Sequence, residues 1–306
     1  MKILIVASFN KNYFAPFIIE QANALGNQGC DVEYFGIVGK GIKGYLNSYK
    51  GLLKKIKELK PDIVHAHYGL SGLLANLQRS IPVVTTYHGS DINVPNVLRF
   101  SKITMRLSIF NIFVSQRNVD IAKPKNKFIL LPCGVNLAGY IENDVNAIKK
   151  QLNWQDDKKY ILFAGAFDNS VKNAALAKDA VKLLDNVELI ELKGYSRNQV
   201  AALFYAVDAF LMTSFTEGSP QVVKEAMACG CPIVSVDVGD VAERTEGLDG
   251  CYIAERNPQD IAKKLNLVLS LNSRTKGRER IIELGLTNDL VAKKLIEIYE
   301  QVIKKN

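Results

Sequence analysis

The chain has 306 residues, of which 48% are hydrophobic and 23% are charged, and its net charge is +8. This size favours two domains, because a single core rarely keeps growing beyond about 250–300 residues. The composition argues against a disordered chain or a coiled coil, and no apolar run approaches the roughly 20 residues of a membrane-spanning helix. The first apolar run, 3–7, stops at Ser8. We therefore expect a buried strand there rather than a secretory signal, and a cytoplasmic protein with reduced cysteines.

Positive charge is concentrated in the first half of the chain. Residues 1–140 carry 17 Lys and Arg against 7 Asp and Glu, whereas residues 141–306 carry 22 against 24. A basic half indicates an anionic partner. Because no nucleic-acid recognition pattern is present, we expect a phosphorylated lipid acceptor or peripheral contact with an anionic membrane, and no nucleic acid. A generally basic surface without such a partner is the alternative.

Short apolar runs alternate with amphipathic stretches in the first half. Strands are predicted at 3–7, 32–35, 63–66, 83–87, 109–114 and 128–131. Helices are predicted between them, at 14–28, 45–59, 70–78 and 115–122. Alternation of this kind, with short connections, is typical of a parallel sheet covered by helices on both faces.

The second half repeats the pattern. Its predicted strands are 160–164, 187–192, 209–212, 233–236 and 251–253. Its predicted helices are 173–184, 197–205, 220–229 and 258–271. The polar stretch 138–157 has no strand pattern, so we expect an N-terminal domain over 1–137, a C-terminal domain over 138–286 and a terminal helix in 287–306. Two such domains would bind ligands in a cleft, at the carboxyl ends of their strands.

The segment 213–232 carries the strongest chemical signal. It leaves a predicted strand, passes Glu217 and enters a helix, for which Ser219 is a good N-cap and Pro220 suits the first helical position. The free N–H groups at this helix start would then bind phosphate, namely those of Gln221, Val222 and Val223.

Two charged side chains near this segment are open to two interpretations. Glu225 lies among apolar residues, where a carboxylate needs a partner. The two hydroxyls of a ribose would satisfy it, and so would Lys224 or another cation. Lys172 stands at the predicted start of a helix, where a cation opposes the helix dipole unless an anion is near. A bound diphosphate would supply that anion; otherwise Lys172 is a solvated surface lysine.

Several motifs in sequence order resemble one enzyme family. Glu217 and Glu225, eight residues apart and followed by Ala-Met-Ala-Cys-Gly-Cys-Pro, resemble its E-x7-E motif. The segments 87–91 (Tyr-His-Gly-Ser-Asp), 131–136 (Leu-Pro-Cys-Gly-Val-Asn) and 237–240 (Asp-Val-Gly-Asp) are similar to other segments of the family. The chain thus resembles the family 4 (group 1) retaining glycosyltransferases. The resemblance implies their GT-B fold, an α/β architecture in which two Rossmann-like domains face each other and a C-terminal helix returns to the first.

The resemblance also implies residue roles. His88 would contact the donor sugar or diphosphate near the reacting carbon, Glu217 would lie against the donor sugar, and Lys172 would neutralise the leaving diphosphate. Glu225 would bind the ribose hydroxyls. The remaining implied donor contacts are Gly218, Ser219, Pro220, Gln221, Gly194, Tyr195, Arg197 and Asp91.

The chain departs from the family pattern at three places. Ala166 stands where members usually carry an arginine, so one phosphate-binding cation is missing. Arg197 or a lysine of the N-terminal half would have to replace it. Ser219-Pro220 replaces Phe-Gly, which removes one amide donor. The loop after the first strand lacks the usual Gly-Gly, so its side chains would meet the ligand or acceptor instead, those of Asn10, Lys11 and Asn12.

The remaining histidines alternate on one predicted strand. His67, near its carboxyl end, would line the cleft, and His65 would be a hydrogen-bonded core residue. Because no third ligand is suggested by spacing, we expect no metal site.

The implied function is retaining transfer of a hexose-type sugar from a UDP- or GDP-sugar to a glycan or lipid-linked acceptor, as in surface polysaccharide or glycolipid synthesis. The resemblance implies no metal and no cofactor beyond the nucleotide-sugar co-substrate. Two alternatives stay open at this point, namely a non-catalytic binder of nucleotide sugars or glycans and a nucleotide-sugar epimerase of the same architecture. A dehydrogenase is disfavoured because no G-x-G-x-x-G follows the first strand.

Overall fold

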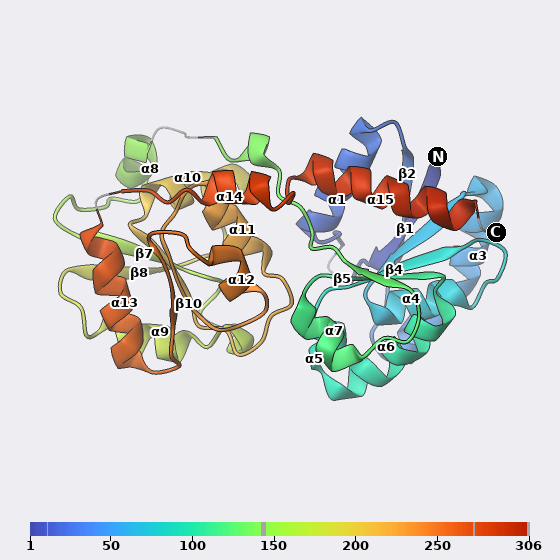
Figure 1. The fold of residues 1–306 in the computed structure, drawn as a ribbon, viewed down its shortest axis with the longest axis horizontal. Coiled ribbons are helices and arrows are strands. Elements are labelled where there is room, and N and C mark those ends of the chain that lie inside the picture. The colour runs from blue at the N-terminus through green and yellow to red at the C-terminus, as the bar shows by residue number, and fades with distance from the viewer. Residues whose placement is uncertain (11, 142–144, 272, 305–306) are drawn as a thin grey trace. The chain divides into compact units, whose positions relative to one another are not determined.

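The computed structural model of the chain describes residues 1–10, 12–141, 145–271 and 273–304, without the side chain of residue 42. The chain forms two compact units. Unit 1 comprises Met1–Gly134 and Leu286–Asn306, and unit 2 comprises Val135–Gly285. Each unit is a parallel sheet with helices packed on it (Figure 1). The prediction of two parallel-sheet α/β units is therefore confirmed.

Unit 1 holds a six-stranded sheet in the order β2-β1-β3-β4-β5-β6, and all of its pairings are parallel. The strands are β1 (Lys2–Ser8), β2 (Asp31–Ile37), β3 (Ile63–His67), β4 (Val83–Tyr87), β5 (Phe110–Phe113) and β6 (Phe128–Leu130). Because successive side chains of a strand point to opposite faces, β1 contributes side chains to a hydrophobic core on each face of the sheet. Ile3 and Ile5 pack into one hydrophobic cluster, and Leu4 and Val6 pack into another.

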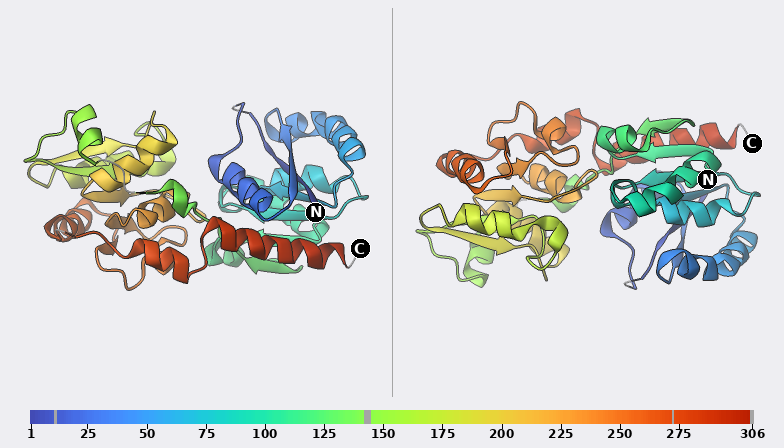
Figure 2. Two further views of the ribbon diagram at one scale, coloured as in Figure 1. Left: turned by 90° about the horizontal axis from the view of Figure 1, so that it is seen from above. Right: turned by 90° about the horizontal axis from the view of Figure 1, so that it is seen from below.

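Helices cover both faces of this sheet. They are α1 (Pro16–Asn27), α2 (Gly41–Asn47), α3 (Tyr49–Leu59), α4 (Gly69–Asn76), α5 (Ser90–Asn93), α6 (Pro95–Leu107), α7 (Gln116–Ala122) and α15 (Asn288–Ile303). The cluster that contains Ile3 draws on α1 and α15, and the cluster that contains Leu4 draws on α3 and α4. Although α15 is the last helix of the chain, it lies beside α1, as the view from above also shows (Figure 2, left).

Unit 2 holds a five-stranded parallel sheet in the order β11-β10-β9-β7-β8. The strands are β7 (Lys159–Phe163), β8 (Val187–Glu191), β9 (Ala209–Met212), β10 (Ile233–Val236) and β11 (Cys251–Ala254). The helices are α8 (Val145–Gln151), α9 (Ala174–Val181), α10 (Arg197–Ala206), α11 (Gln221–Ala228), α12 (Val241–Thr245), α13 (Pro258–Ser270) and α14 (Gly277–Glu283). Figure 1 shows α10 and α11 on one side of the sheet and α9 and α13 on the other.

The fold differs from the predicted elements in two ways. The helix expected over 45–59 is interrupted at Ser48, whose N–H donates to the carbonyl of Tyr45 and whose hydroxyl donates to the carbonyl of Val38. Helices α5, α6, α8, α12 and α14 were not predicted. α6 begins at Pro95, a residue suited to the first turn of a helix.

Candidate active site

The loop between β9 and α11 carries the first part of the E-x7-E motif. α11 begins at Gln221, and Pro220 is its N-cap, with extended dihedral angles (φ −66°, ψ 117°). The expectation that Ser219 caps this helix is therefore wrong, because the Ser219 hydroxyl instead accepts a hydrogen bond from Lys224 Nζ at 3.2 Å. The expectation of a free N–H at Val223 is also wrong, since this group donates to the carbonyl of Pro220 at 3.2 Å.

Glu217, in this loop, forms a short ion pair with Lys172. The distance from Lys172 Nζ to Glu217 Oε1 is 2.7 Å, and the two side chains are only 19% and 17% exposed. Lys172 ends a 3-10 turn (Ser170–Lys172) that precedes α9. The cation at this helix start thus has an anion beside it, and in this structure the anion is Glu217. The contact with a donor diphosphate stays a prediction.

Neighbouring loops fix the position of this ion pair. Thr213 donates its hydroxyl to the carbonyls of Lys172 and Asn173, at 3.0 and 2.9 Å. Gly239, in the segment 237–240, has φ +61°, and a Cβ there would lie 2.7 Å from the carbonyl oxygen of Gly218. Glycine is therefore required at 239, because the loop that carries Glu217 and Gly218 packs directly on it.

Glu225, the second acid of the motif, is buried in α11 and pairs with Arg197. The distance from Arg197 Nη1 to Glu225 Oε1 is 2.6 Å, and the carboxylate side chain is 8% exposed. Arg197 is the first residue of α10, whose N-cap Ser196 forms a capping box with Gln199. The cation partner left open by the sequence is thus Arg197 and not Lys224. The contact between Glu225 and a ribose stays a prediction.

The remaining predicted donor residues of unit 2 lie on the loops around these ion pairs. Gly194 has φ +82°, and it precedes Tyr195 in the turn that leads to the N-cap of α10. At the place of the missing family arginine, Ala166 follows Gly165, and a Cβ at Gly165 would lie 3.1 Å from Lys172 Cγ. Glycine at 165 therefore leaves room for the aliphatic part of Lys172.

In unit 1, Asp91 organises the loops that follow β3 and β4. Its carboxylate accepts the N–H groups of Gly69, His88 and Gly89 at 2.9–3.0 Å. Burial raises the pKa of Asp91 to about 6, and these three hydrogen bonds oppose that rise. Because its side chain binds the loop after β3 and the loop after β4, Asp91 fixes the position of the His88 backbone.

His88 lies between His67 and Cys133. The distance from His88 Nε2 to His67 Nδ1 is 2.9 Å, and that from His88 Nδ1 to Cys133 Sγ is 3.8 Å. His67 is fully buried and does not line the cavity described below, contrary to its expected place in a cleft; burial lowers its pKa well below the usual value. The sequence did not single out Cys133 as a neighbour of His88.

The hydrogen bonding favours one tautomer for this histidine pair. His67 Nε2 is buried without a hydrogen-bond partner among the described residues. A buried N–H without a partner is rarer and costlier than an acceptor without one. The Nδ1–H of His67 therefore donates to His88 Nε2, so that a neutral His88 carries its proton on Nδ1, toward Cys133.

His65 is a core residue, as predicted. It is fully buried and bonded at both ring nitrogens, to the hydroxyl of Tyr299 at 2.6 Å and to the hydroxyl of Thr86 at 2.8 Å. Burial lowers its pKa to about 3. This contact fastens α15 to the sheet of unit 1.

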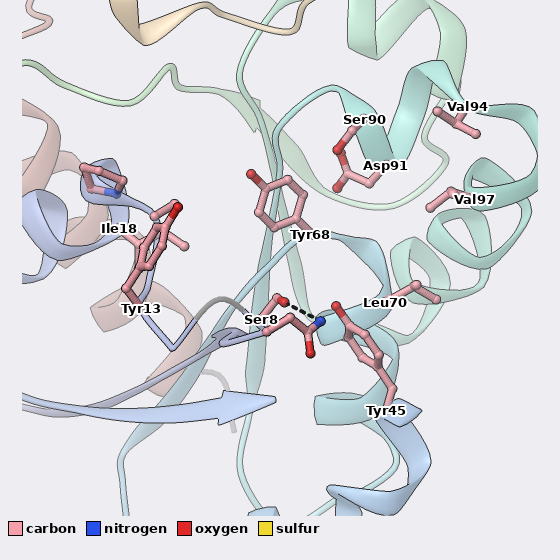
Figure 3. Close-up of a pocket in the computed structure, with 13 residues that line it drawn as sticks. Ser8, Tyr13, Ile18, Tyr45, Tyr68, Leu70, Ser90, Asp91, Val94 and Val97 are labelled. Carbon is pink, nitrogen blue, oxygen red and sulfur yellow. Dashed lines mark hydrogen bonds between the residues drawn. The ribbon is translucent and has the colours of Figure 1, made fainter. Parts of the chain in front are cut away.

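A cavity of about 620 Å³ opens near this cluster in unit 1 (Figure 3). It is lined by side chains of the loops and helices that follow β1, β2, β3 and β4, including Asn10, Tyr13, Tyr45, Tyr68, Ser90 and Asp91. Of the three loop residues predicted to meet a ligand, Asn10 lines the cavity, Asn12 does not, and Lys11 lies outside the described residues. The tyrosines were not predicted, although Tyr68 directly follows a strand, where ligand-binding residues gather.

Two further properties bear on the chemistry of the site. Among the residues that the structure describes, no group of three or more His, Cys, Asp or Glu side chains is arranged to hold a metal ion. No helix in the described part of the chain is both long and apolar enough to cross a bilayer.

Two sequence families match the chain, one in each half. The family described as Glycosyltransferase Family 4 matches residues 31–138, and the family described as Glycosyl transferases group 1 matches residues 140–270. Both matches contain residues placed above, His88 in the first and the two acids of the E-x7-E motif in the second.

Relatives are found among bacterial proteins. The chain is 28% identical over 242 residues to TuaC of Bacillus subtilis, a glycosyltransferase named for teichuronic acid biosynthesis, with 69% of this chain and 62% of that protein covered. The chain thus spans less than two thirds of TuaC. It is 25% identical over 310 residues to the N,N'-diacetylbacillosaminyl-diphospho-undecaprenol alpha-1,3-N-acetylgalactosaminyltransferase of Campylobacter jejuni, with 85% and 82% covered.

A solved structure shares the fold. The Anabaena protein HepE, in complex with UDP, superposes with a TM-score of 0.78 at 15% identity, covering 98% of this chain and all of the other. The fold is accordingly GT-B. With both halves matched by the families and the motifs in the expected order, the chain belongs to the family 4, group 1 glycosyltransferases.

Proposed function

We propose that this protein transfers a hexose-type sugar from a nucleoside-diphosphate sugar, UDP- or GDP-linked, to a glycan or lipid-linked acceptor, with retention of configuration. The observation that carries the proposal is the pairing of each acid of the E-x7-E motif with one cation, Glu217 with Lys172 and Glu225 with Arg197. Two cations and two acids on the loops and helices of unit 2 offer a nucleotide sugar positive charge for its diphosphate and acceptors for its hydroxyls.

The proposed donor site is in unit 2. When the donor binds, its diphosphate replaces Glu217 as the ion-pair partner of the Lys172 ammonium group. The Glu217 carboxylate then accepts a hydrogen bond from a hydroxyl of the sugar. Glu225, held in a buried position by α11, accepts the ribose hydroxyls. Arg197 then binds the diphosphate as well as Glu225. This contact would replace the one that the family's arginine makes and that Ala166 cannot make.

The proposed reaction is substitution at the anomeric carbon. The bond from this carbon to the diphosphate oxygen breaks, and its electron pair leaves with the diphosphate. The acceptor hydroxyl forms the new bond on the same face and passes its proton to a phosphate oxygen. Fixed positive charge beside the leaving oxygen stabilises the charge that develops there, and such groups contribute several kcal/mol in enzymes. Because Lys172 and Arg197 provide this charge, we propose that transfer needs no divalent metal and no further cofactor.

The proposed setting is polysaccharide or glycolipid synthesis at the inner face of a membrane. It is supported by the names of TuaC and of the Campylobacter enzyme, which refer to teichuronic acid and to a diphospho-undecaprenol acceptor. The excess of Lys and Arg in residues 1–140 supports peripheral contact with anionic lipid. Flotation with vesicles that contain 30% phosphatidylglycerol should retain the protein at low salt and release it at 0.5 M salt.

The test is a thermal-shift panel of nucleoside diphosphates and nucleotide sugars, followed by release of the nucleotide in the presence of glycan acceptors. Glu225→Ala should abolish the shift and the turnover, whereas Glu188→Ala, which removes an acid exposed on the surface of unit 2, should keep both. Activity should persist in EDTA, and the anomeric configuration of the product should match the donor. A protein that binds donors but neither hydrolyses nor transfers them would be a binder instead.

A further inference from the structure

The cavity in unit 1 differs in chemistry from the donor-side loops of unit 2. Its described lining residues include three tyrosines and several aliphatic side chains but no lysine, arginine or histidine. Its volume of about 620 Å³ is within the range of small-molecule sites, about 300–1,000 Å³. The rings of Tyr13, Tyr45 and Tyr68 lie around the hollow (Figure 3).

Tyr68 is held in this cavity by an unusual backbone. Its φ of 74° and ψ of 148° belong to a region that residues other than glycine rarely occupy. Its N–H donates to the carbonyl of Thr86 at 2.8 Å, and its carbonyl accepts the N–H of Gly72 at 2.9 Å. Strain of this kind persists only where surrounding structure enforces it, and it concentrates at functional sites. Here it aims a phenol ring into the cavity, 4.7 Å from the ring of His88.

The polar groups of the cavity suit hydroxyls and not anions. The Asp91 carboxylate is already occupied by three backbone N–H groups. The amide of Asn10 is bonded to the hydroxyl of Ser8 and to the backbone of Gly39. Burial and the nearby Asp91 raise the pKa of Tyr68, so its phenol stays protonated and uncharged. A phosphate or carboxylate placed here would lose water without gaining a cation from the described lining residues, which is costly.

We propose that this cavity holds the uncharged sugar residue of the acceptor that receives the transferred sugar. The proposal rests on the transferase function given above and adds the class of acceptor. A neutral sugar has C–H groups that pack against the electron-rich faces of tyrosine rings, and hydroxyls for the phenol and serine oxygens. A neutral sugar also carries no charge, and the described lining residues include no cation that could pair with one. The contact of Tyr68 with His88 joins this cavity to the residue expected at the reacting carbon.

The experiment compares matched neutral and charged acceptors. Methyl glycosides of neutral hexoses are offered beside the corresponding methyl uronides and hexose 6-phosphates, each with the donor identified in the thermal-shift panel. We expect neutral acceptors to exceed their charged partners at least tenfold in kcat/KM. Tyr13→Ala, which alters a side chain that is 54% exposed, should raise the acceptor KM roughly three- to tenfold and leave the donor KM unchanged.

A gain of charge provides the converse test. Val94 lines the cavity and is 43% exposed, so Val94→Lys adds a cation there at little cost to folding. This variant should shift the preference toward uronides and 6-phosphates by at least tenfold. Val38→Lys is the matched control, because Val38 is exposed, lies in the same unit and is not among the lining residues. It should leave the preference unchanged.

The two proposals fail in distinguishable ways. If no nucleotide or nucleotide sugar binds and no donor is hydrolysed, the transferase function itself is refuted. If the donor binds and is hydrolysed, but charged acceptors are preferred or Val94→Lys has no more effect than Val38→Lys, the assignment of a neutral sugar to this cavity is overturned. Inhibition of transfer by an alkyl alcohol that lacks a sugar, competitive with the acceptor, would overturn it in favour of an apolar occupant.

Discussion

Two ion pairs of equal length in unit 2 allow the role of burial to be measured directly. Arg197 lies 2.6 Å from Glu225, and Lys193 lies 2.6 Å from Asp168. The carboxylate side chain of Glu225 is 8% exposed, whereas that of Asp168 is 71% exposed. Replacing each cation by alanine therefore leaves behind a buried charge in one case and a hydrated charge in the other.

The expected losses of stability differ severalfold. An exposed ion pair contributes little to stability, so Lys193→Ala should leave the free energy of unfolding almost unchanged. Breaking a fully buried pair costs about 3–5 kcal/mol. Because the Arg197 side chain is 40% exposed, water reaches part of this site. We therefore expect a loss of about 2–3 kcal/mol for Arg197→Ala.

The assay is urea unfolding followed by tryptophan fluorescence. The chain has a single tryptophan, Trp154, which stacks on Tyr160 in unit 2 and so reports on that unit. With a slope of about 2 kcal/mol per molar urea, Arg197→Ala should lower the midpoint by roughly 1 M, whereas Lys193→Ala should leave it almost unchanged. Adding Glu225→Gln to Arg197→Ala should restore part of the loss, because a buried amide carries no charge. Equal midpoints for the two single variants would refute the reasoning.

Three other outcomes follow from contacts in the two units. Lys172→Ala should lower kcat about 10²–10³-fold in nucleotide-release assays, because it removes the cation that we propose to face the leaving diphosphate, whereas Lys172→Arg should lose less. Tyr299→Phe should lower the stability of unit 1 by about 1–3 kcal/mol in urea unfolding followed by circular dichroism, because the buried Nδ1 of His65 loses its donor. The pH dependence has opposing parts. Since burial lowers the pKa of His65 from 6.5 to about 3, the unfolded chain binds more protons, and stability should fall as the pH decreases from 6.5 toward 3. The raised pKa of Asp91, about 6 instead of 3.8, acts in the opposite sense between pH 6 and 4. His65→Asn should therefore flatten the loss of stability in acid; an unchanged slope would contradict this.

The sequence by itself determined the class of fold and the elements that carry the two acids of the E-x7-E motif. Short continuous apolar runs, such as 3–7, are typical of strands buried on both faces, and their alternation with amphipathic stretches favours parallel pairing. Motif spacing placed Glu217 in a loop and Glu225 in the following helix, and both are there in the structure. The sequence preferences for helix caps predicted the start of α11 less accurately. Pro220, expected inside the first turn, is instead the N-cap, because the hydroxyl of the expected cap, Ser219, bonds to Lys224.

Only the tertiary structure decided which groups meet. The partners Lys172 and Glu217 are 45 residues apart, and Tyr299 and His65 are 234 residues apart. The hydrophobic periodicity of a sequence predicts helices and strands, which are local. Contacts between residues far apart in the sequence depend instead on strand order and on where each loop leaves its sheet. The cavity that Tyr68 lines is of the same kind, since its walls come from segments that follow four different strands. The sequence therefore indicated the E-x7-E motif, and the folded chain alone brought together the tyrosine-lined cavity beside His88.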